Sequence, residues 1–418
     1  SSVLPWYYTP KFIFMTIPLA VMAGALIDLV TGWTKERWFW TLFLLFCFVF
    51  PVVWIVITKA NVYGGWRHSM FCYPTLVALA GLGFYSLYER FQKPALRWGL
   101  GVALPMVLLI GPIRHVFANH PYEYVYFNEL SGGIKNAYGR YEMDYYYHST
   151  REGTEWVMSH ADTSALGPGE KIKIATWHPS SVGYYVRLYD TAHFRCVFSR
   201  IYQMGNNDWD YAVFTITGMN PEWIKNKEVF PPKNTVHTVD VDGVPICIVL
   251  KREDKSDLYG YQAMKAGKID SAKMFYHRAY AYDPNNEQVL ENMANIYLDE
   301  RKPDSAVFYA ARWVNNVPSN ATALSLLANA YMMKGDFSGA LGVTTQMKEY
   351  MPDDINGYWI AANCYLQQRN LQMALNELQA LVNIRPIPQA FQLMAQIYQA
   401  AGQAQAAQQC LNIASQLR

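Results

Sequence analysis

The residues best suited to chemistry lie in three short stretches that combine aromatic side chains with charges. Guanidinium and imidazole groups bind phosphate through charge-assisted hydrogen bonds, and aromatic planes offer stacking surfaces for a sugar. These residue types suit a lipid-linked phosphate, and they suit equally well the anchoring of a protein at a membrane interface. The stretches are residues 4–11, with Trp6, Tyr7, Tyr8 and Lys11; residues 63–68, with Arg67 and His68; and residues 120–146, with Tyr124, Tyr126, Asn128, Arg140 and Asp144.

The acidic residues of these stretches do not identify a catalytic base. Glu123, Glu142 and Asp144 show no spacing that singles out a carboxylate pair. The six cysteines are scattered without a Cys-x-x-Cys or Cys/His pattern, so the sequence predicts no metal site. Two disulfides would form only if the fold brought their partners together: Cys196 with Cys247, and Cys364 with Cys410.

Long apolar stretches must position these residues. Each approaches the roughly 20 residues needed to cross a hydrocarbon core of about 30 Å. Tryptophan and tyrosine gather at their ends, as in the aromatic belts of membrane proteins, and their internal prolines are tolerated better in a membrane than in a soluble helix. The sequence therefore predicts about four transmembrane helices within residues 1–116, and a buried soluble bundle is the alternative. The expected spans are about residues 12–30, 38–58, 71–88 and 96–116.

Basic residues in the connecting loops set the expected orientation. The excess of Lys and Arg lies in the loops 32–37 and 89–95. The positive-inside rule places these loops in the cytoplasm, and residues 1–11, 59–70 and everything after Val116 outside. We therefore expect a multi-pass protein of the bacterial inner membrane, with its soluble portion in the periplasm.

Asp28 is the one acidic residue within an expected span. It lies about a turn from the cytoplasmic end. There a carboxylate either reaches the headgroups or caps the helix, or it makes a functional contact with an ion or lipid.

From Ser149 to about Arg252 the pattern changes to alternating helices and strands, which predicts a small α/β domain outside the membrane within residues 117–253. The segment holds no GxGxxG, Walker or GxSxG motif, so it gives no independent sign of catalysis. The expected helices are about 152–160 and 180–188, and the expected strands are 172–176, 194–198, 211–217, 236–241 and 244–250, with a hairpin turn at Asp242-Gly243.

Residues 254–418 repeat with a period of 34 residues, which predicts an all-α solenoid of about five tetratricopeptide repeats. Each helix pair cannot bury its apolar face alone, so neighbouring pairs stack into a superhelix with a concave groove. The recurring residues are structural: small residues let helices approach closely, and proline ends the second helix. They are Pro284, Pro318, Pro352 and Pro386, with Ala294, Ala328 and Ala362 among the small ones.

A groove of this kind binds a peptide or another protein. Asn292, Asn295, Asn329 and Asn363 fall on the expected first helices of the repeats and offer hydrogen bonds to an extended partner. A solvated face without a partner is the alternative. The formal net charge is +2 and no Lys/Arg-rich run occurs, which argues against nucleic acid as a partner.

The three aromatic stretches resemble the C-terminal part of bacterial membrane glycosyltransferases of the GT-C superfamily. The resemblance is to the glycosyltransferase family 39-like group of protein mannosyltransferases and aminoarabinose transferases. Pro5–Tyr8 matches its Pro-Trp-Tyr-Tyr stretch before a span, and Gly65–His68 matches its Gly-Trp-Arg-His stretch, followed by Tyr73-Pro74. His120–Tyr145 matches the stretch after the last span. The resemblance covers about residues 3–160, and the repeats are a separate module.

The resemblance implies an enzyme that moves a sugar from a polyprenyl-phosphate donor to an acceptor on the outer face. It implies that Arg67 and His68 contact the donor phosphate, and that Trp6, Tyr7 and Tyr8 contact the donor or the acceptor. The family's acidic catalytic residue lies in a first outer loop near the N-terminus, which this chain lacks. We therefore expect the chain to be a partial one, with the last four of about a dozen spans. The catalytic base stays unnamed, and a divalent metal stays open as a cofactor.

Two hypotheses follow for function. In the first, the chain is the C-terminal portion of a polyprenyl-phosphate-dependent glycosyltransferase whose repeats recruit acceptors or partners. In the second, it is a non-catalytic, membrane-anchored scaffold whose repeats organise a complex of the cell envelope. A transporter or channel is disfavoured, because the spans hold almost no charge beyond Asp28.

Overall fold

The computed structural model describes residues 4–417 and forms two compact units. The first, here the membrane–sheet unit, comprises residues up to 198 together with 210–221 and 235–251. The second, the repeat unit, comprises residues 199–209, 222–234 and those from 252 onward. Residues 1–3, which belong to the segment predicted to lie outside the membrane, are outside the described residues. The domain boundaries that the sequence predicts, after residues 116 and 253, remain predictions.

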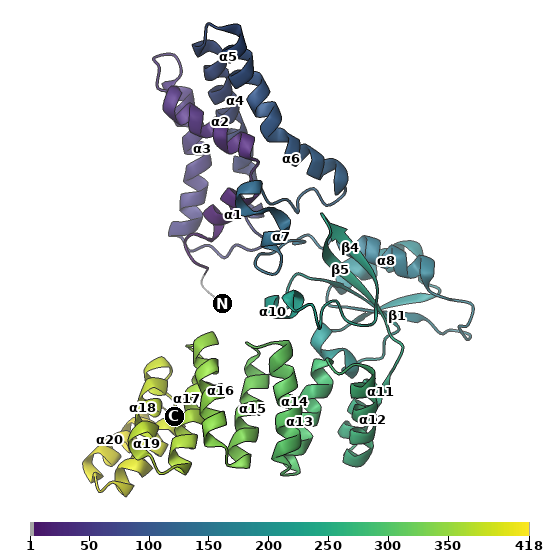
Figure 1. Cartoon of the computed structure of the whole chain (residues 1–418), viewed down its shortest axis with the longest axis vertical. Helices are drawn as coiled ribbons and strands as arrows, with labels where there is room; N and C mark the ends of the chain where they lie inside the picture. Colours follow the sequence, from purple (N-terminus) through teal and green to yellow (C-terminus); the bar gives the residue numbers. More distant parts are fainter. Residues whose placement is uncertain (1–3, 418) are drawn as a thin grey trace. The chain divides into compact units, whose positions relative to one another are not determined.

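Apolar helices make up the first part of the membrane–sheet unit (Figure 1). Among residues 4–417, three helical runs are long and apolar enough to cross a membrane, namely Trp38–Ile57, Arg67–Arg90 and Pro94–Ala118, and a bent pair brings the total to as many as four. The elements are α1 (Tyr8–Thr16), α2 (Leu19–Thr31), α3 (Trp38–Ile57), η1 (Arg67–Cys72), α4 (Tyr73–Arg90), α5 (Pro94–Trp98), η2 (Gly99–Ala103) and α6 (Leu104–Ala118).

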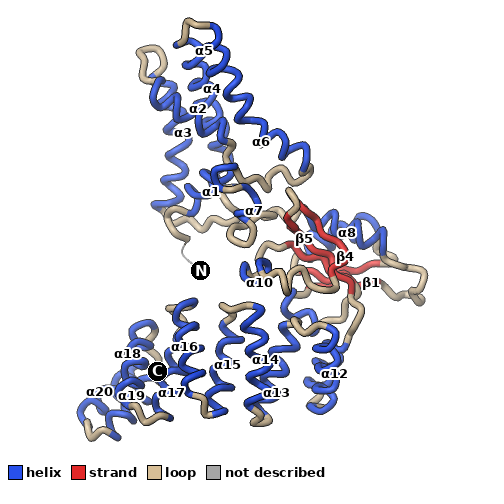
Figure 2. The backbone as a smooth tube through the Cα atoms, viewed as in Figure 1, coloured by secondary structure: helices blue, strands red, loops and turns tan. Residues whose placement is uncertain are grey.

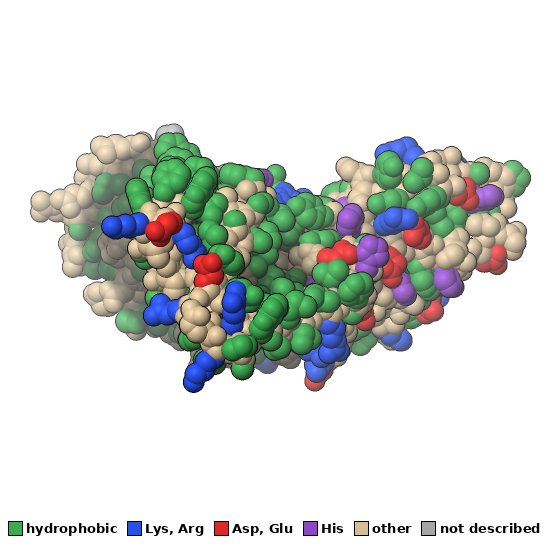
Figure 3. Space-filling model, turned by 90° about the horizontal axis from the view of Figure 1, so that it is seen from above, with side chains coloured by type: hydrophobic (Ala, Val, Ile, Leu, Met, Phe, Trp, Pro, Cys, Tyr) green, Lys and Arg blue, Asp and Glu red, His purple; other side chains and the backbone are tan. Residues whose placement is uncertain are grey.

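The surface of these helices is unusually apolar. In α3, Thr41 is the one buried residue, while aromatic side chains such as Phe46, Phe50 and Trp54 are exposed. Figure 3 looks onto the end of the helices and shows hydrophobic side chains over them, with Lys and Arg side chains among them. Exposed apolar surface of this extent marks a protein or membrane contact.

The expected first span is bent. Helices α1 and α2 meet at an angle of 110°. Pro18 has no N–H, and it holds Ile17 in an extended conformation (φ −84°, ψ 135°), so one continuous helix cannot form. Helix α2 has 13 residues and rises about 20 Å, less than the roughly 30 Å of a hydrocarbon core.

Asn128 donates hydrogen bonds to the carbonyls that the bend leaves without helical partners. Its amide Nδ2 donates to the carbonyls of Phe14 (2.6 Å) and Ile17 (2.9 Å), and its backbone N–H donates to that of Met15 (2.8 Å). Asn128 is fully buried. A break in a membrane helix is tolerated where a neighbour satisfies the freed backbone groups, and here that neighbour lies more than a hundred residues away in sequence.

Asp28 is buried in an ion pair and does not reach toward the headgroups. Its Oδ1 lies 2.6 Å from Nη2 of Arg37, and its Oδ2 accepts a hydrogen bond from the Thr41 hydroxyl at 2.9 Å. Arg37 also donates to the Leu82 carbonyl (3.0 Å) and to the Ser86 hydroxyl. Since Leu82 and Ser86 lie on α4, this polar network joins α2, the start of α3 and α4.

The α/β segment forms one five-stranded sheet with the order β2-β1-β3-β5-β4 (Figure 2). Strands β1, β2 and β3 pair in parallel, and β3, β5 and β4 pair antiparallel. Each predicted strand is confirmed, with small differences at the ends. The elements are α7 (Gly133–Ala137), α8 (Ser149–His160), β1 (Ile172–Thr176), α9 (Pro179–Tyr189), β2 (Phe194–Phe198), β3 (Tyr211–Thr215), α10 (Pro221–Lys225), β4 (Thr235–Val241) and β5 (Val244–Lys251), with 3₁₀ turns η3 (Glu129–Ser131) and η4 (Ile201–Asn206).

The predicted hairpin turn at Asp242-Gly243 is confirmed, with φ values of 49° and 74°. The turn contacts the end of α6. The Asp242 carboxylate accepts a hydrogen bond from the Asn119 amide (2.9 Å) and lies 3.0 Å from Nδ1 of His115. The backbone N–H of Asp242 donates back to Asn119 Oδ1 at 2.9 Å. The sheet and the last apolar helix are therefore held together by a reciprocal amide contact.

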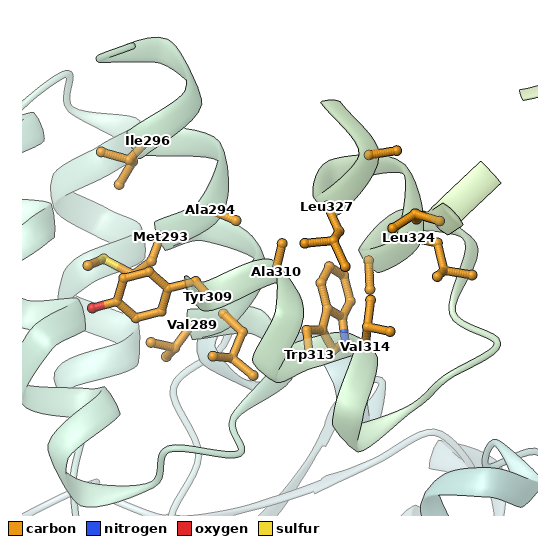
Figure 4. Packing of buried hydrophobic residues seen from close by; sticks show 14 of the residues in the cluster. Val289, Met293, Ala294, Ile296, Tyr309, Ala310, Trp313, Val314, Leu324 and Leu327 are labelled. Carbon is orange, nitrogen blue, oxygen red and sulfur yellow. The ribbon is translucent and has the colours of Figure 1, made fainter. Parts of the chain in front are cut away.

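The repeat unit contains five helix pairs, as the period predicts. In each pair we call the first helix A and the second helix B. Alanines at the repeating small positions are buried. One apolar core runs from residue 272 to residue 364 (Figure 4), and a second runs from residue 355 to residue 410. The pairs are α11 (Ser256–Lys265) with α12 (Ile269–Tyr282), α13 (Glu287–Asp299) with α14 (Pro303–Asn316), α15 (Ala321–Lys334) with α16 (Phe337–Tyr350), α17 (Ile355–Gln367) with α18 (Leu371–Ile384), and α19 (Pro388–Ala400) with α20 (Ala404–Gln416).

All six cysteines are free thiols. Neither of the two disulfides left open by the sequence is formed.

Candidate functional site

Residues from all three aromatic stretches meet in one cluster, and the third stretch contributes through its last residues. The interfacial cluster consists of Tyr8, Arg67, Glu142 and Tyr145, with Gly64 and Gly65 between them. The backbone N–H of Gly64 donates to Glu142 Oε2 at 2.8 Å, and the Tyr8 hydroxyl donates to the same oxygen at 3.2 Å. The N–H of Gly65 donates to the Tyr8 oxygen at 3.2 Å.

The two glycines make this arrangement possible. Their φ values of 66° and 67° are strained for other residues. A Cβ on Gly64 would lie 3.0 Å from Nε of Arg67, and one on Gly65 would lie 3.2 Å from the Phe12 ring. The turn therefore brings its backbone N–H groups close to the cluster.

Arg67 has hydrogen-bonding capacity to spare. One of its amino groups donates to the Tyr145 carbonyl at 3.2 Å, and the guanidinium lies 4.4 Å from the Tyr63 ring centre and 5.8 Å from that of Tyr146. Among the residues that the structure describes, no carboxylate forms an ion pair with Arg67. A planar guanidinium that is stacked on aromatic rings and unpaired with an acid can bind an anion such as phosphate.

Two cavities adjoin the cluster. A cavity of about 330 Å³ is lined by Phe12, Trp66, Tyr126, Glu142 and Tyr145 among others. A second, of about 240 Å³, is lined by Trp6, Tyr8 and Lys59 among others. Both cavities have room for part of an amphipathic ligand. Glu142 lines the larger cavity and Tyr8 the smaller one, and the hydrogen bond between these two residues links the cavities' walls.

Four other predicted site residues of the first two stretches are exposed, namely Trp6, Tyr7, Lys11 and His68. Trp6 is 71% exposed and packs edge-on against Tyr7. The Lys11 amino group lies 4.9 Å from the Tyr141 ring centre, and the exposed His68 ring packs edge-on against Tyr63 at 4.9 Å. Arg140 is exposed as well.

Several residues of the third stretch that were predicted to contact a ligand form hydrogen bonds within the protein instead. Asp144 is fully buried and accepts hydrogen bonds from the Tyr124 and Ser149 hydroxyls and from the His148 N–H (3.0 Å). Burial raises the pKa of Asp144, and burial together with this carboxylate raises the pKa of Tyr124. The Tyr126 hydroxyl donates to Glu129 at 3.3 Å. With Asn128 at the helix break, these groups brace the loop that follows α6.

Glu142 and Tyr145 were missed as site residues by sequence reasoning, in which Glu142 is only one of several outer acids. The 78-residue separation of Glu142 from Gly64 hides the contact between them. Within the described residues, no group of three or more His, Cys, Asp or Glu side chains is placed to hold a metal ion.

A second candidate site lies on the A helices of the repeats, where a segment of the chain itself is already bound. Residues 199–209, which include η4, pack against α11 and α13. The N–H of Gly205 donates to Gln288 Oε1 at 2.9 Å, and the Gln288 amide donates to Asn206 Oδ1. Arg252 pairs with Asp257, donates to the Asn207 carbonyl (2.7 Å) and stacks on Trp209 (4.8 Å).

A family model described as tetratricopeptide repeat matches residues 263–330, and a model described as anaphase-promoting complex, cyclosome, subunit 3 matches residues 299–381. Residues 263–381 are tetratricopeptide repeats. This confirms the repeat prediction over the middle of the array. Both matches lie within the repeats, and no curated protein matches the chain.

Solved structures similar to this chain cover about two fifths of it. A crystal structure of MamA is 20% identical, covers 40% of this chain and 95% of that chain, and has a TM-score of 0.36. MamA 41-end from Desulfovibrio magneticus RS-1 is 16% identical over 39% of this chain and 95% of that chain, with a TM-score of 0.36. A thermophilic TPR protein in Thermus thermophilus is 19% identical over 38% of this chain and 87% of that chain, with a TM-score of 0.31. Likeness at this level says nothing about function.

Proposed function

We propose that this chain is a membrane-anchored tetratricopeptide-repeat protein whose repeats bind a protein partner beside the membrane. One observation carries the proposal: a single polypeptide combines long apolar helices with an exposed surface and an array of tetratricopeptide repeats. The helices restrict the repeats to the membrane surface, and the repeats supply a large surface on which a partner can bind. This is the arrangement of a scaffold that gathers proteins of the cell envelope.

The proposal is tested by capturing partners in intact membranes. The tagged full chain is cross-linked and purified beside a version that lacks residues 255–418. We expect specific proteins to co-purify with the full chain and to be absent from the shortened one. An identical set of proteins with both versions would overturn the proposal, because the partners would then bind elsewhere.

A second candidate function is sugar transfer from a polyprenyl-phosphate donor, with this chain as part of the enzyme. The unpaired Arg67 guanidinium favours it, because this cation lies among aromatic rings beside two cavities. In this proposal Arg67, His68 and Lys11 bind the donor phosphate, and Trp6, Tyr7 and Tyr8 contact the sugar or the lipid. Tyr124, Tyr126, Asn128, Arg140 and Asp144 shape the outer loop on the acceptor side.

The test of this candidate is a transfer assay in membranes with a polyprenyl-phosphate-linked sugar. If Arg67 holds the phosphate, Arg67→Ala lowers transfer by a hundredfold or more, on the order of the loss of a charge-assisted contact worth about 3 kcal/mol. Lys135→Ala, which removes an exposed cation of α7, leaves transfer unchanged. Transfer that survives Arg67→Ala at the full rate would remove Arg67 from the donor site.

A further inference from the structure

The segment bound to the first two repeats shows how the A helices hold a polypeptide. Gln288 of α13 is 7% exposed because residues 205 and 206 cover it, and both ends of its amide are used. A Cβ on Gly205 would lie 2.9 Å from Gln288 Oε1 and 3.0 Å from Asp257 Oδ2. The contact is therefore made to a backbone that approaches closely, which favours a residue without a Cβ at that point.

The position of Gln288 recurs along the array. Steps of 34, 34 and 33 residues lead to Thr322, Asn356 and Gln389, all of which are polar and exposed. Residues seven apart lie on one stripe of a helix, two turns from each other. The residue seven beyond each of these four positions is an amide: Asn295, Asn329, Asn363 and Gln396.

These side chains form a polar stripe, which we call the amide stripe. Its members on α15, α17 and α19 are exposed, except Asn363, which is half-buried. The amides of Asn295 and Asn363 donate to the backbone carbonyl four residues before them, at 3.0 and 2.8 Å. That contact uses one N–H and leaves the amide oxygen to accept from a ligand.

Charge is almost absent from these helices. In α15, α17 and α19 the only charged residue is Lys334, at the end of α15. A phosphate-bearing, acidic or nucleic-acid ligand would find no cation to pair with along the stripe. An apolar helix would leave the amides without hydrogen bonds, which is costly once they are buried. A polar backbone satisfies them.

We propose that the amide stripe of α15, α17 and α19 binds an uncharged, glycine-containing segment of a partner polypeptide through its backbone amides. The bound segment continues the mode in which α11 and α13 hold η4 (Ile201–Asn206) of the chain itself. This inference rests on the proposed function that the repeats bind a protein partner. It adds which helices bind and what chemistry they select.

A library of displayed random nonapeptides, selected on the detergent-solubilised full chain, tests the proposal. Selected peptides are synthesised, and their Kd values are measured by fluorescence anisotropy. We expect uncharged peptides that contain glycine. Their Kd should change less than about twofold between roughly 50 mM and 500 mM salt, since no ion pair contributes.

Matched variants locate the site. The double variant Asn329→Ala, Asn363→Ala should raise Kd about tenfold or more, because two hydrogen-bonding amides are lost. The control Gln379→Ala, Asn383→Ala removes two exposed amides from helix α18, a B helix, and should bind as the unaltered chain does.

Three outcomes would overturn the inference: no enriched peptide, charged peptides that salt releases, or equal binding by the two double variants. If partners still co-purify through residues 255–418 under any of these outcomes, the scaffold function stands and the partner binds another face of the repeats. If they do not, the proposed function fails as well.

Discussion

At the scale of single residues, buried polar groups decide how the apolar helices pack. Asp28 is fully buried, and its charge is balanced by Arg37 and a hydroxyl. Breaking a buried pair by removing one partner leaves an uncompensated charge, which costs far more than the intact pair contributes.

Arg37→Ala should therefore destabilise the chain by about 3–5 kcal/mol, because Asp28 is left buried without its cation. Unfolding of the detergent-solubilised chain by a denaturing detergent measures this. Asp28→Asn combined with Arg37→Ala should recover a large part of the loss, since the orphaned charge is gone. Equal losses in the single and double variants would show that Asp28 does not need a cation.

His178 is a buried titratable residue outside the apolar helices, and it makes the stability of the fold depend on pH. It follows β1, stacks on the Tyr147 ring at 3.7 Å between centres, and lies 3.3 Å from the Thr215 hydroxyl. Burial lowers the pKa of His178 to about 4. The unfolded chain then takes up a proton near pH 6.5 while the folded chain does not, so this histidine's contribution to stability is complete above that pH and falls as the pH drops toward about 4.

We expect the unaltered chain to lose more thermal stability than His178→Gln when the pH falls from about 7 to about 5. Melting temperatures of both proteins at the two pH values measure the difference. A parallel decline in both would mean that His178 is not the group that titrates.

At the scale of elements, close packing of A and B helices depends on alanine at fixed positions. Ala294, Ala328 and Ala362 are fully buried at intervals of 34 residues. There is no space at these positions for a longer side chain, since protein interiors are packed to near-crystal density.

Ala328→Leu should destabilise the repeats by about 1–3 kcal/mol through overpacking. Urea unfolding followed by circular dichroism measures the change. The matched control is Ala404→Leu on the exposed side of α20, which should alter stability by less than about 0.5 kcal/mol. A similar loss in both variants would indicate a general effect of added leucine.

At the scale of the whole molecule, the apolar runs α3, η1–α4 and α5–α6 follow one another with short connections. If all three cross the membrane, the connection before η1 and the sheet domain lie on one side and the loop between α4 and α5 on the other. Lys93 in that loop, with Arg90 and Arg97 in the helices beside it, predicts the cytoplasm for the loop.

Single cysteines at Asn61, Lys93 and Ser164, in a background whose native cysteines are alanine, test this topology. A membrane-impermeant maleimide applied to sealed spheroplasts should label positions 61 and 164 and leave 93 unlabelled until the membrane is opened. Labelling of all three from one side would exclude the proposed arrangement. This experiment does not depend on whether the bent pair α1–α2 crosses fully.

The amino-acid sequence alone determined the features that depend on neighbours along the chain. The proline period revealed the five helix pairs, alternation located the strands, and Asp242-Gly243 predicted the turn. Only the tertiary structure showed the bend that Asn128 holds, the Asp28–Arg37 pair, the Glu142 contact with Gly64 and the segment bound beside Gln288. Some of these features join groups that are distant in sequence. Others depend on which polar groups are buried away from water and therefore need a partner within the protein. Periodicity records which face of an element is apolar, but it does not record which remote polar group will satisfy a particular carbonyl, amide or charge.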